Sequence, residues 1–96
     1  MVYETKLTSL DELFEELQNL ESDEGVRMLT DEAGKRRMVF VTRHSGRYAI
    51  AICAAAAKGG RWVPGKTLQF LEFFDQKRLR EFLSSIATKP LKAYLY

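Results

Sequence analysis

Basic and aromatic side chains alternate through the middle of this chain of 96 residues. Lysine and arginine neutralise phosphates, and exposed rings stack on unpaired bases with about 1–3 kcal/mol per base. Arginine also stacks its planar guanidinium group on rings and bases. The combination favours a single-stranded nucleic acid as the partner, because a duplex hides its base faces. The residues expected at such a site are Arg36, Arg37, Phe40, Arg43, Arg47, Tyr48, Arg61, Trp62, Lys66 and Phe70.

These residues divide into two expected roles. The five arginines and Lys66 are expected to neutralise the phosphate backbone, and the four rings are expected to stack bases. The sequence leaves open whether Phe40, Tyr48 and Phe70 are exposed or lie in the core, and which sheet face or cleft binds. Phe73 and Phe74, at the end of an expected strand, are assigned to the core.

Charge is distributed unevenly along the chain. Residues 1–32 contain ten acidic and two basic side chains, whereas residues 33–96 contain three acidic and thirteen basic ones, for a total of +2. Between Ala33 and Leu71 there are eight basic residues and no acidic one. This asymmetry favours a polyanionic partner. The alternative is that the acidic first third pairs with the basic middle inside the molecule.

Motifs that would support catalysis are weak. His44 lies in an expected turn without Cys or His at metal-ligand spacing, and Cys53 has no paired histidine. Residues Gly60 to Thr67 match the Gly-x-x-x-x-Gly-Lys-Thr pattern, but the residues after Thr67 favour a strand, whereas a phosphate-binding loop opens a helix. We therefore expect a protein that is not an enzyme, with no catalytic residues, metal or cofactor.

Two amphipathic helices are expected at the two ends of the chain. Ser9 and Glu12 form a capping-box pattern, and apolar residues at helical spacing follow from Leu10 to Leu20. Asp75 is the expected N-cap of the second helix, which has an apolar stripe from Leu79 to Ile86. Pro90 prevents that helix from continuing.

Four strands are expected between the helices, at residues 26–30, 36–42, 47–54 and 66–74. A tight turn at Ser45-Gly46 would pair Val41 with Ile50 and Phe40 with Ala51. Alternation then places Val39, Val41, Ile50 and Ile52 on a core face and leaves Phe40 on the other. Trp62 is expected in a glycine-rich loop before the fourth strand.

These elements predict an α+β fold with an N-terminal helix, a four-stranded antiparallel β-meander and a C-terminal helix. The length predicts a single domain over residues 1–96. Two helices on one face of the sheet would leave the other face open for interaction. No charge-free stretch reaches the ~20 residues of a membrane span, and no apolar leader follows Met1. The single cysteine suggests a reducing, cytoplasmic setting without a membrane.

The layout resembles the ThermoDBP group of archaeal single-stranded DNA-binding proteins, especially its shorter members. The likeness rests on the acidic helix from Leu10 to Leu20, the basic meander from Arg36 to Ala54, the Arg61-Trp62-Val63-Pro64-Gly65-Lys66 segment and the helix after Asp75. It implies a cleft for single strands with aromatic and apolar walls and a basic rim, and it implies homo-oligomers. The long C-terminal zipper helix of the founding type has no counterpart here, so Tyr94-Leu95-Tyr96 is one candidate surface for self-association.

The sequence thus predicts a non-enzymatic protein that binds single-stranded DNA, or single-stranded RNA, by base stacking in a basic, aromatic-lined cleft or sheet face. The alternative is a protein-interaction subunit that docks a partner on the open sheet face. The two hypotheses differ in salt response, because phosphate contacts release counterions and an apolar protein interface does not.

Overall fold

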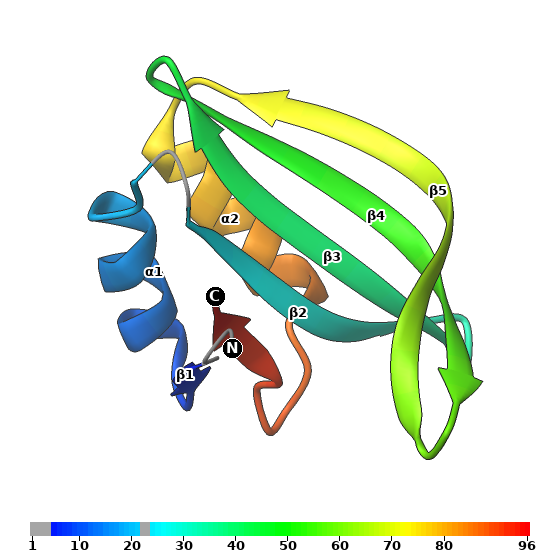
Figure 1. Cartoon of the computed structure of the whole chain (residues 1–96). Helices are drawn as coiled ribbons and strands as arrows, with labels where there is room; N and C mark the ends of the chain where they lie inside the picture. The colour runs from blue at the N-terminus through cyan, green and yellow to red at the C-terminus, as the bar shows by residue number, and fades with distance from the viewer. Residues whose placement is uncertain (1–4, 22–23) are drawn as a thin grey trace.

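The computed structural model describes residues 5–21 and 24–96, so Glu4 and Asp23 of the acidic segment lie outside the described residues. Over the described part of the chain, six antiparallel strands form one sheet and two helices pack on one face of it (Figure 1). The elements follow in the order β1 (Thr5–Leu7), α1 (Leu10–Gln18), β2 (Gly25–Glu32), β3 (Lys35–His44), β4 (Arg47–Lys58), β5 (Arg61–Phe73), α2 (Gln76–Ile86) and β6 (Ala93–Leu95). The order across the sheet is β1-β6-β2-β3-β4-β5.

The expected four-stranded meander is wrong, because the sheet contains two more strands. Both β1 and β6 are only three residues long, too short to show an alternating pattern in the sequence. Strand β6 pairs with β2 on one side and β1 on the other, and these long-range pairings join the two ends of the described chain in one sheet. Tyr94 and Leu95 therefore lie inside the sheet and not in a free tail available for self-association.

The β3–β4 hairpin forms as the sequence predicted. Val41 pairs with Ile50 and Phe40 pairs with Ala51. Ser45 and Gly46 have φ values of 49° and 79°, which is the left-handed pair that a two-residue hairpin turn requires. This turn fixes the register and therefore decides which side chains share each face of the sheet.

Both helices start at the predicted caps. The Ser9 hydroxyl accepts a hydrogen bond from the Glu12 backbone N–H at 3.2 Å, and the Asp75 carboxylate accepts one from the Lys77 N–H at 2.9 Å. Each cap satisfies a backbone donor that has no partner inside the helix. Neither helix in the described residues is long and apolar enough to cross a membrane.

The core lies between the helices and one face of the sheet, here called the helix-covered face. Leu13 and Leu17 of α1 and Leu79 and Leu83 of α2 belong to the same buried cluster as the sheet residues. The sheet contributes Val26, Met28, Val39, Val41, Tyr48 and Ile50. Because side chains alternate along a strand, the residues between these point to the second face, here called the open face. It carries Arg27, Leu29, Met38, Phe40, Ala51, Cys53, Phe70 and Tyr94.

The far end of the β4–β5 hairpin curls over the open face. The register shifts at two places, between Ile52 and Cys53 and between Cys53 and Ala55, and such bulges bend a strand and increase its twist. Met38, although on the open face, is only 1% exposed, and residues 60–64 of the hairpin line the same hollow as Met38. The segment around Trp62, expected as a loop, is thus the first part of a 13-residue strand.

Candidate nucleic-acid interface

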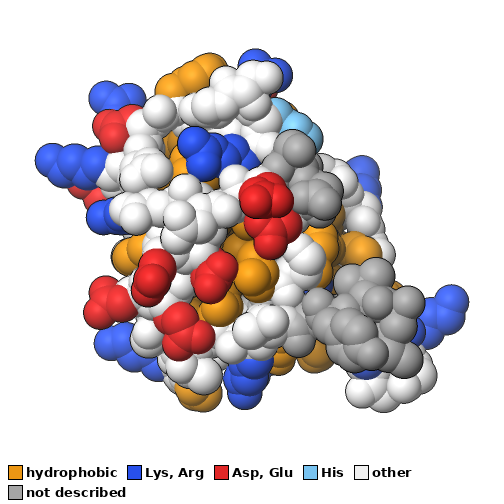
Figure 2. All heavy atoms as spheres, turned by 60° about the vertical axis from the view of Figure 1, so that its left-hand side comes forward, with side chains coloured by type: hydrophobic (Ala, Val, Ile, Leu, Met, Phe, Trp, Pro, Cys, Tyr) orange, Lys and Arg blue, Asp and Glu red, His pale blue; other side chains and the backbone are white. Residues whose placement is uncertain are grey.

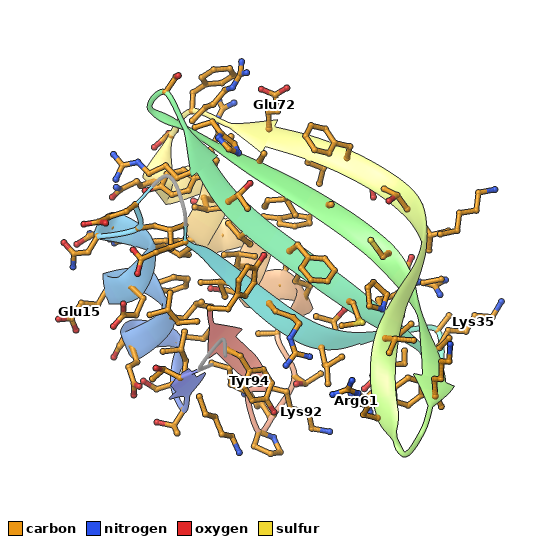
Figure 3. All side chains as sticks on the ribbon, viewed as in Figure 1. Glu15, Lys35, Arg61, Glu72, Lys92 and Tyr94 are labelled. Carbon is orange, nitrogen blue, oxygen red and sulfur yellow. The ribbon has the colours of Figure 1, made fainter. Side chains whose placement is uncertain are left out.

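The curled hairpin and the open face enclose a groove of ≈ 500 Å³, here called the hairpin groove. Residues of β2, β3 and β6 line it on the side of the sheet, and the start of β5 lines it on the side of the curled hairpin. Its lining residues are Arg27, Leu29, Met38, Phe40, Gly60, Arg61, Trp62, Val63, Pro64 and Tyr94. In Figure 3, which looks onto the open face, Arg61 extends from the hairpin and Tyr94 lies across from it on β6. The groove therefore combines aromatic rings with arginines.

Two arginines of this region are stacked on aromatic rings. The Arg27 guanidinium carbon lies 4.6 Å from the Tyr94 ring centre, and that of Arg36 lies 5.6 Å from the Trp62 ring centre. These are cation–π distances, and such stacking holds the cations and the rings in a fixed relation. The contact between Arg36 and Trp62 also ties the curled hairpin to the start of β3.

Arg36 is held by charge as well as by stacking. Its Nε lies 3.2 Å from the Asp31 carboxylate across the β2–β3 hairpin. Its Nη1 atom is buried and has no hydrogen-bond partner. The Arg36 side chain as a whole keeps 21% of its surface exposed, so part of it remains accessible to a ligand.

Comparisons of this chain with protein-family models, with curated proteins and with solved structures found no match.

Four residues of the predicted site meet at the hairpin groove. Phe40, Arg61 and Trp62 line it, and Arg36 stacks on Trp62. Trp62 keeps 39% of its surface exposed, so its ring is accessible to a ligand. The structure thus brings together Arg36 of β3 and Trp62 of β5, which are 26 positions apart in the sequence.

Three more predicted residues lie outside the groove, on or beside β4 and β5. Phe70 is on the open face and is 60% exposed. Arg47 pairs with Glu72, with 3.3 Å between its Nε and the carboxylate. Lys66 is exposed on β5. These residues could extend a binding surface beyond the groove towards the β5 edge.

Tyr48 does not offer its ring to a ligand, which corrects its expected stacking role. It is only 2% exposed and lies in the core beneath both helices. Its hydroxyl donates to the Leu17 carbonyl oxygen at 3.0 Å and accepts from the Gln76 amide nitrogen at 3.2 Å. The strand alternation that places Ile50 in the core places Tyr48 there as well.

Arg37 and Arg43 share strand β3 with Val39 and Val41 and point to the helix-covered face, on the side away from the groove. The Arg43 Nη1 donates to the Gln18 carbonyl oxygen at 3.2 Å, near the end of α1. The Arg37 Nε lies 3.6 Å from the Glu32 carboxylate. The structure therefore does not bring these two residues together with Phe40, Arg61 and Trp62.

Arg27 and Tyr94 are groove residues that the sequence did not single out. Arg27 stood in an expected strand with an acidic segment before it, and Tyr94 stood in an expected tail. Their relation depends on the pairing of β6 with β2, which places them directly opposite each other. The aromatic side chain of Tyr94 is visible in the sequence as a possible stacking residue. The pairing of its strand with β2 cannot be recognised from the sequence.

Charges of opposite sign are partly paired and partly segregated. The pairs Arg36–Asp31, Arg37–Glu32 and Arg47–Glu72 show that some acidic residues do neutralise the basic middle of the chain. Figure 2 looks onto the side that carries α1, and acidic side chains are spread over it. Asp11 and Glu15 of that helix are exposed. A polyanion would thus be repelled from α1 and would meet arginines on the open face.

The Gly60–Thr67 pattern is not a phosphate-binding loop. Gly65, Lys66 and Thr67 lie within strand β5, which continues to Phe73, and the next helix, α2, begins only at Gln76. A phosphate-binding loop needs a helix N-terminus whose N–H groups face the phosphate. Among the described residues there is also no group of three or more His, Cys, Asp or Glu side chains that could hold a metal ion.

Proposed function

We propose that this protein binds single-stranded nucleic acid in the hairpin groove and is not an enzyme. The observation that carries the proposal is the meeting of three rings, Phe40, Trp62 and Tyr94, with the arginines Arg27 and Arg61 around one hollow. Rings stack on bases without regard to sequence, and arginines follow the phosphates. Arg36, which stacks on Trp62 and keeps 21% of its side chain exposed, adds a positive charge beside the groove.

A single strand fits this proposal better than a duplex does. Duplex readers usually place a helix or a two-stranded ribbon in the major groove. Here both helices pack on the face opposite to the hairpin groove, and α1 is acidic. The rings of the groove need bases whose faces are exposed, which an unpaired strand supplies.

The proposal is tested by fluorescence anisotropy with a labelled single strand of about 20 nucleotides, as DNA and as RNA, beside a duplex of the same sequence. The intact protein is expected to bind the single strands and to prefer them to the duplex. Trp62, the single tryptophan, is expected to lose fluorescence as the strand binds. No binding to any strand at micromolar protein would reject the proposal.

The Trp62→Ala variant tests the position of the site. We expect about fivefold or greater loss of affinity, the value of one base–aromatic stack. Circular dichroism and the urea midpoint report whether the variant is folded. Full affinity in a folded variant would place the site away from the groove.

A second candidate function is the docking of a protein partner on the open side of the sheet. The observation in its favour is that Leu68, Phe70 and Phe74 are exposed apolar side chains on or directly after β5, an edge strand. The two functions differ in the salt dependence of the affinity, because phosphate contacts release counterions and apolar contacts do not. Large exposed apolar side chains also fit self-association, and a homo-oligomer is part of the proposal.

We propose in addition that the chain is related to the ThermoDBP group, which it resembles. We also propose that it is located in the cytoplasm, where nucleic acid is available. Light scattering on the purified chain gives its oligomeric state directly. The resemblance rests on layout, and the binding assay tests what it implies about the ligand.

A further inference from the structure

Six residues, one from each strand, form a single row across the open face. The strand pairings join Lys6 to Tyr94, Tyr94 to Arg27, Arg27 to Phe40, Phe40 to Ala51, and Ala51 to Phe70. Residues paired in an antiparallel sheet lie on the same face, so this row is continuous from one edge of the sheet to the other. It runs at right angles to the strands and passes through the hairpin groove at Tyr94, Arg27 and Phe40.

The three rings of the row are separated by regular intervals. Strands of a sheet lie about 4.8 Å apart, so Tyr94 and Phe40 start from backbones about 10 Å apart, and so do Phe40 and Phe70. Arg27 fills the first interval and stacks on Tyr94. Ala51 stands in the second interval, and its small side chain leaves a shallow space between Phe40 and Phe70.

Two bases that contact neighbouring rings of this row cannot be stacked directly on each other. Stacked bases follow one another at about 3.4 Å, much less than the distance of about 10 Å between neighbouring rings. Bases that contact successive rings must therefore be separated from each other. Separating the bases costs a purine run more stacking energy than it costs a pyrimidine run. The spacing of the rings therefore favours strands whose bases stack weakly on each other.

We infer that the nucleic acid crosses the sheet along this row with its bases unstacked, that Phe70 is a base-stacking subsite outside the groove, and that pyrimidine-rich strands are the preferred ligands. The inference rests on the proposed function. A strand that ran parallel to the β-strands would pass from Phe40 towards the hairpin tip and would not meet Phe70. The role of Phe70 therefore distinguishes the two paths.

The chain contains a matched control for Phe70. Phe74, which the sequence wrongly assigned to the core, is 75% exposed and stands four positions further along the chain, directly after β5 and outside the row. Phe70 is 60% exposed, so neither ring is needed for the core and both alanine variants should fold. The two variants remove the same type of side chain near the same edge and differ in whether the ring belongs to the row.

The experiment measures the affinity of oligothymidine and oligoadenosine strands of about 12 nucleotides for the intact chain and for Phe70→Ala, Phe74→Ala and Trp62→Ala. We expect the intact chain to bind oligothymidine at least about fivefold more tightly than oligoadenosine. Phe70→Ala should weaken oligothymidine binding by between about fivefold and about 150-fold, the value of one base–aromatic stack. Phe74→Ala should bind like the intact chain, and urea midpoints confirm that each variant is folded.

Failure of this inference differs from failure of the proposed function. If Trp62→Ala weakens binding but Phe70→Ala does not, the groove binds the strand and the path across the sheet is wrong. Equal affinity for the two oligonucleotides rejects the unstacked arrangement. If Phe74→Ala weakens binding as much as Phe70→Ala does, the edge is a general apolar contact and the row is not the path. If the intact chain binds no strand, the proposed function itself fails and the inference falls with it.

Discussion

Tyr48 connects β4 to both helices through one hydroxyl group, because it donates to Leu17 of α1 and accepts from Gln76 of α2. In Tyr48→Phe the ring still fills its place, but a buried carbonyl oxygen and an amide lose their partner. We expect the free energy of unfolding to fall by about 1–2 kcal/mol, measured by urea denaturation. Single-strand affinity at a temperature where the variant is folded should not change. Weaker single-strand binding at an unchanged free energy of unfolding would mean that Tyr48 contributes to binding after all.

The two neighbours Arg36 and Arg37 show how strand alternation separates residues of the same type. Each pairs with an acidic residue of β2, but Arg36 stacks on Trp62 beside the groove, whereas Arg37 points to the helix-covered face. We expect Arg36→Ala to weaken single-strand binding about tenfold, the value of a charged hydrogen bond, and Arg37→Ala to change it less than about twofold. Anisotropy titrations at one salt concentration compare the two variants.

This pair is a strict control for long-range electrostatics. Both variants lower the net charge by one unit, and both leave an acidic residue of the β2–β3 hairpin without its arginine. A general attraction between a basic surface and a polyanion would be weakened equally by either change. Equal losses would therefore contradict a defined contact at Arg36 and would favour a diffuse basic surface.

The sequence predicted the elements whose patterns are local. The helix stripes, both N-caps and the Ser45-Gly46 hairpin need only neighbouring residues, and each formed as expected. The groove depends on two features that are not local. Strand β6 is three residues long and is defined by its partners, and the curl of β4–β5 depends on bulges between alanine-rich and glycine-containing segments. The sequence therefore predicted Phe40 and Trp62 but not their meeting with Arg27 and Tyr94.

The curl also makes a prediction for Gly65. A side chain at this position would start 3.2 Å from the Ala54 carbonyl oxygen, a contact tighter than most real ones. Gly65→Val should therefore push β5 away from β4 near the bulge and open the groove. We expect a lower urea midpoint and weaker single-strand binding, with circular dichroism still showing the sheet. Unchanged stability and affinity would mean that the hairpin accommodates the side chain without losing its curl.

The salt dependence of binding distinguishes the arginines that the structure places at the groove from the larger set that the sequence suggested. For a single strand, the logarithm of the affinity falls with the logarithm of salt concentration by about 0.7 for each phosphate neutralised. The six basic residues singled out from the sequence would give a slope of about −4. Arg27, Arg36 and Arg61 at the hairpin groove would give about −2.

We expect a slope of about −2 for oligothymidine, measured by anisotropy over a range of salt concentrations. Arg36→Ala should reduce it by about 0.7, and Arg37→Ala should leave it unchanged. A slope near −4 would mean that Arg47 and Lys66, or the arginines of the helix-covered face, also contact phosphates. A slope near zero would contradict phosphate contacts altogether. The apolar residues of β5 would then carry the interaction, and a protein partner on the open side would be the better explanation.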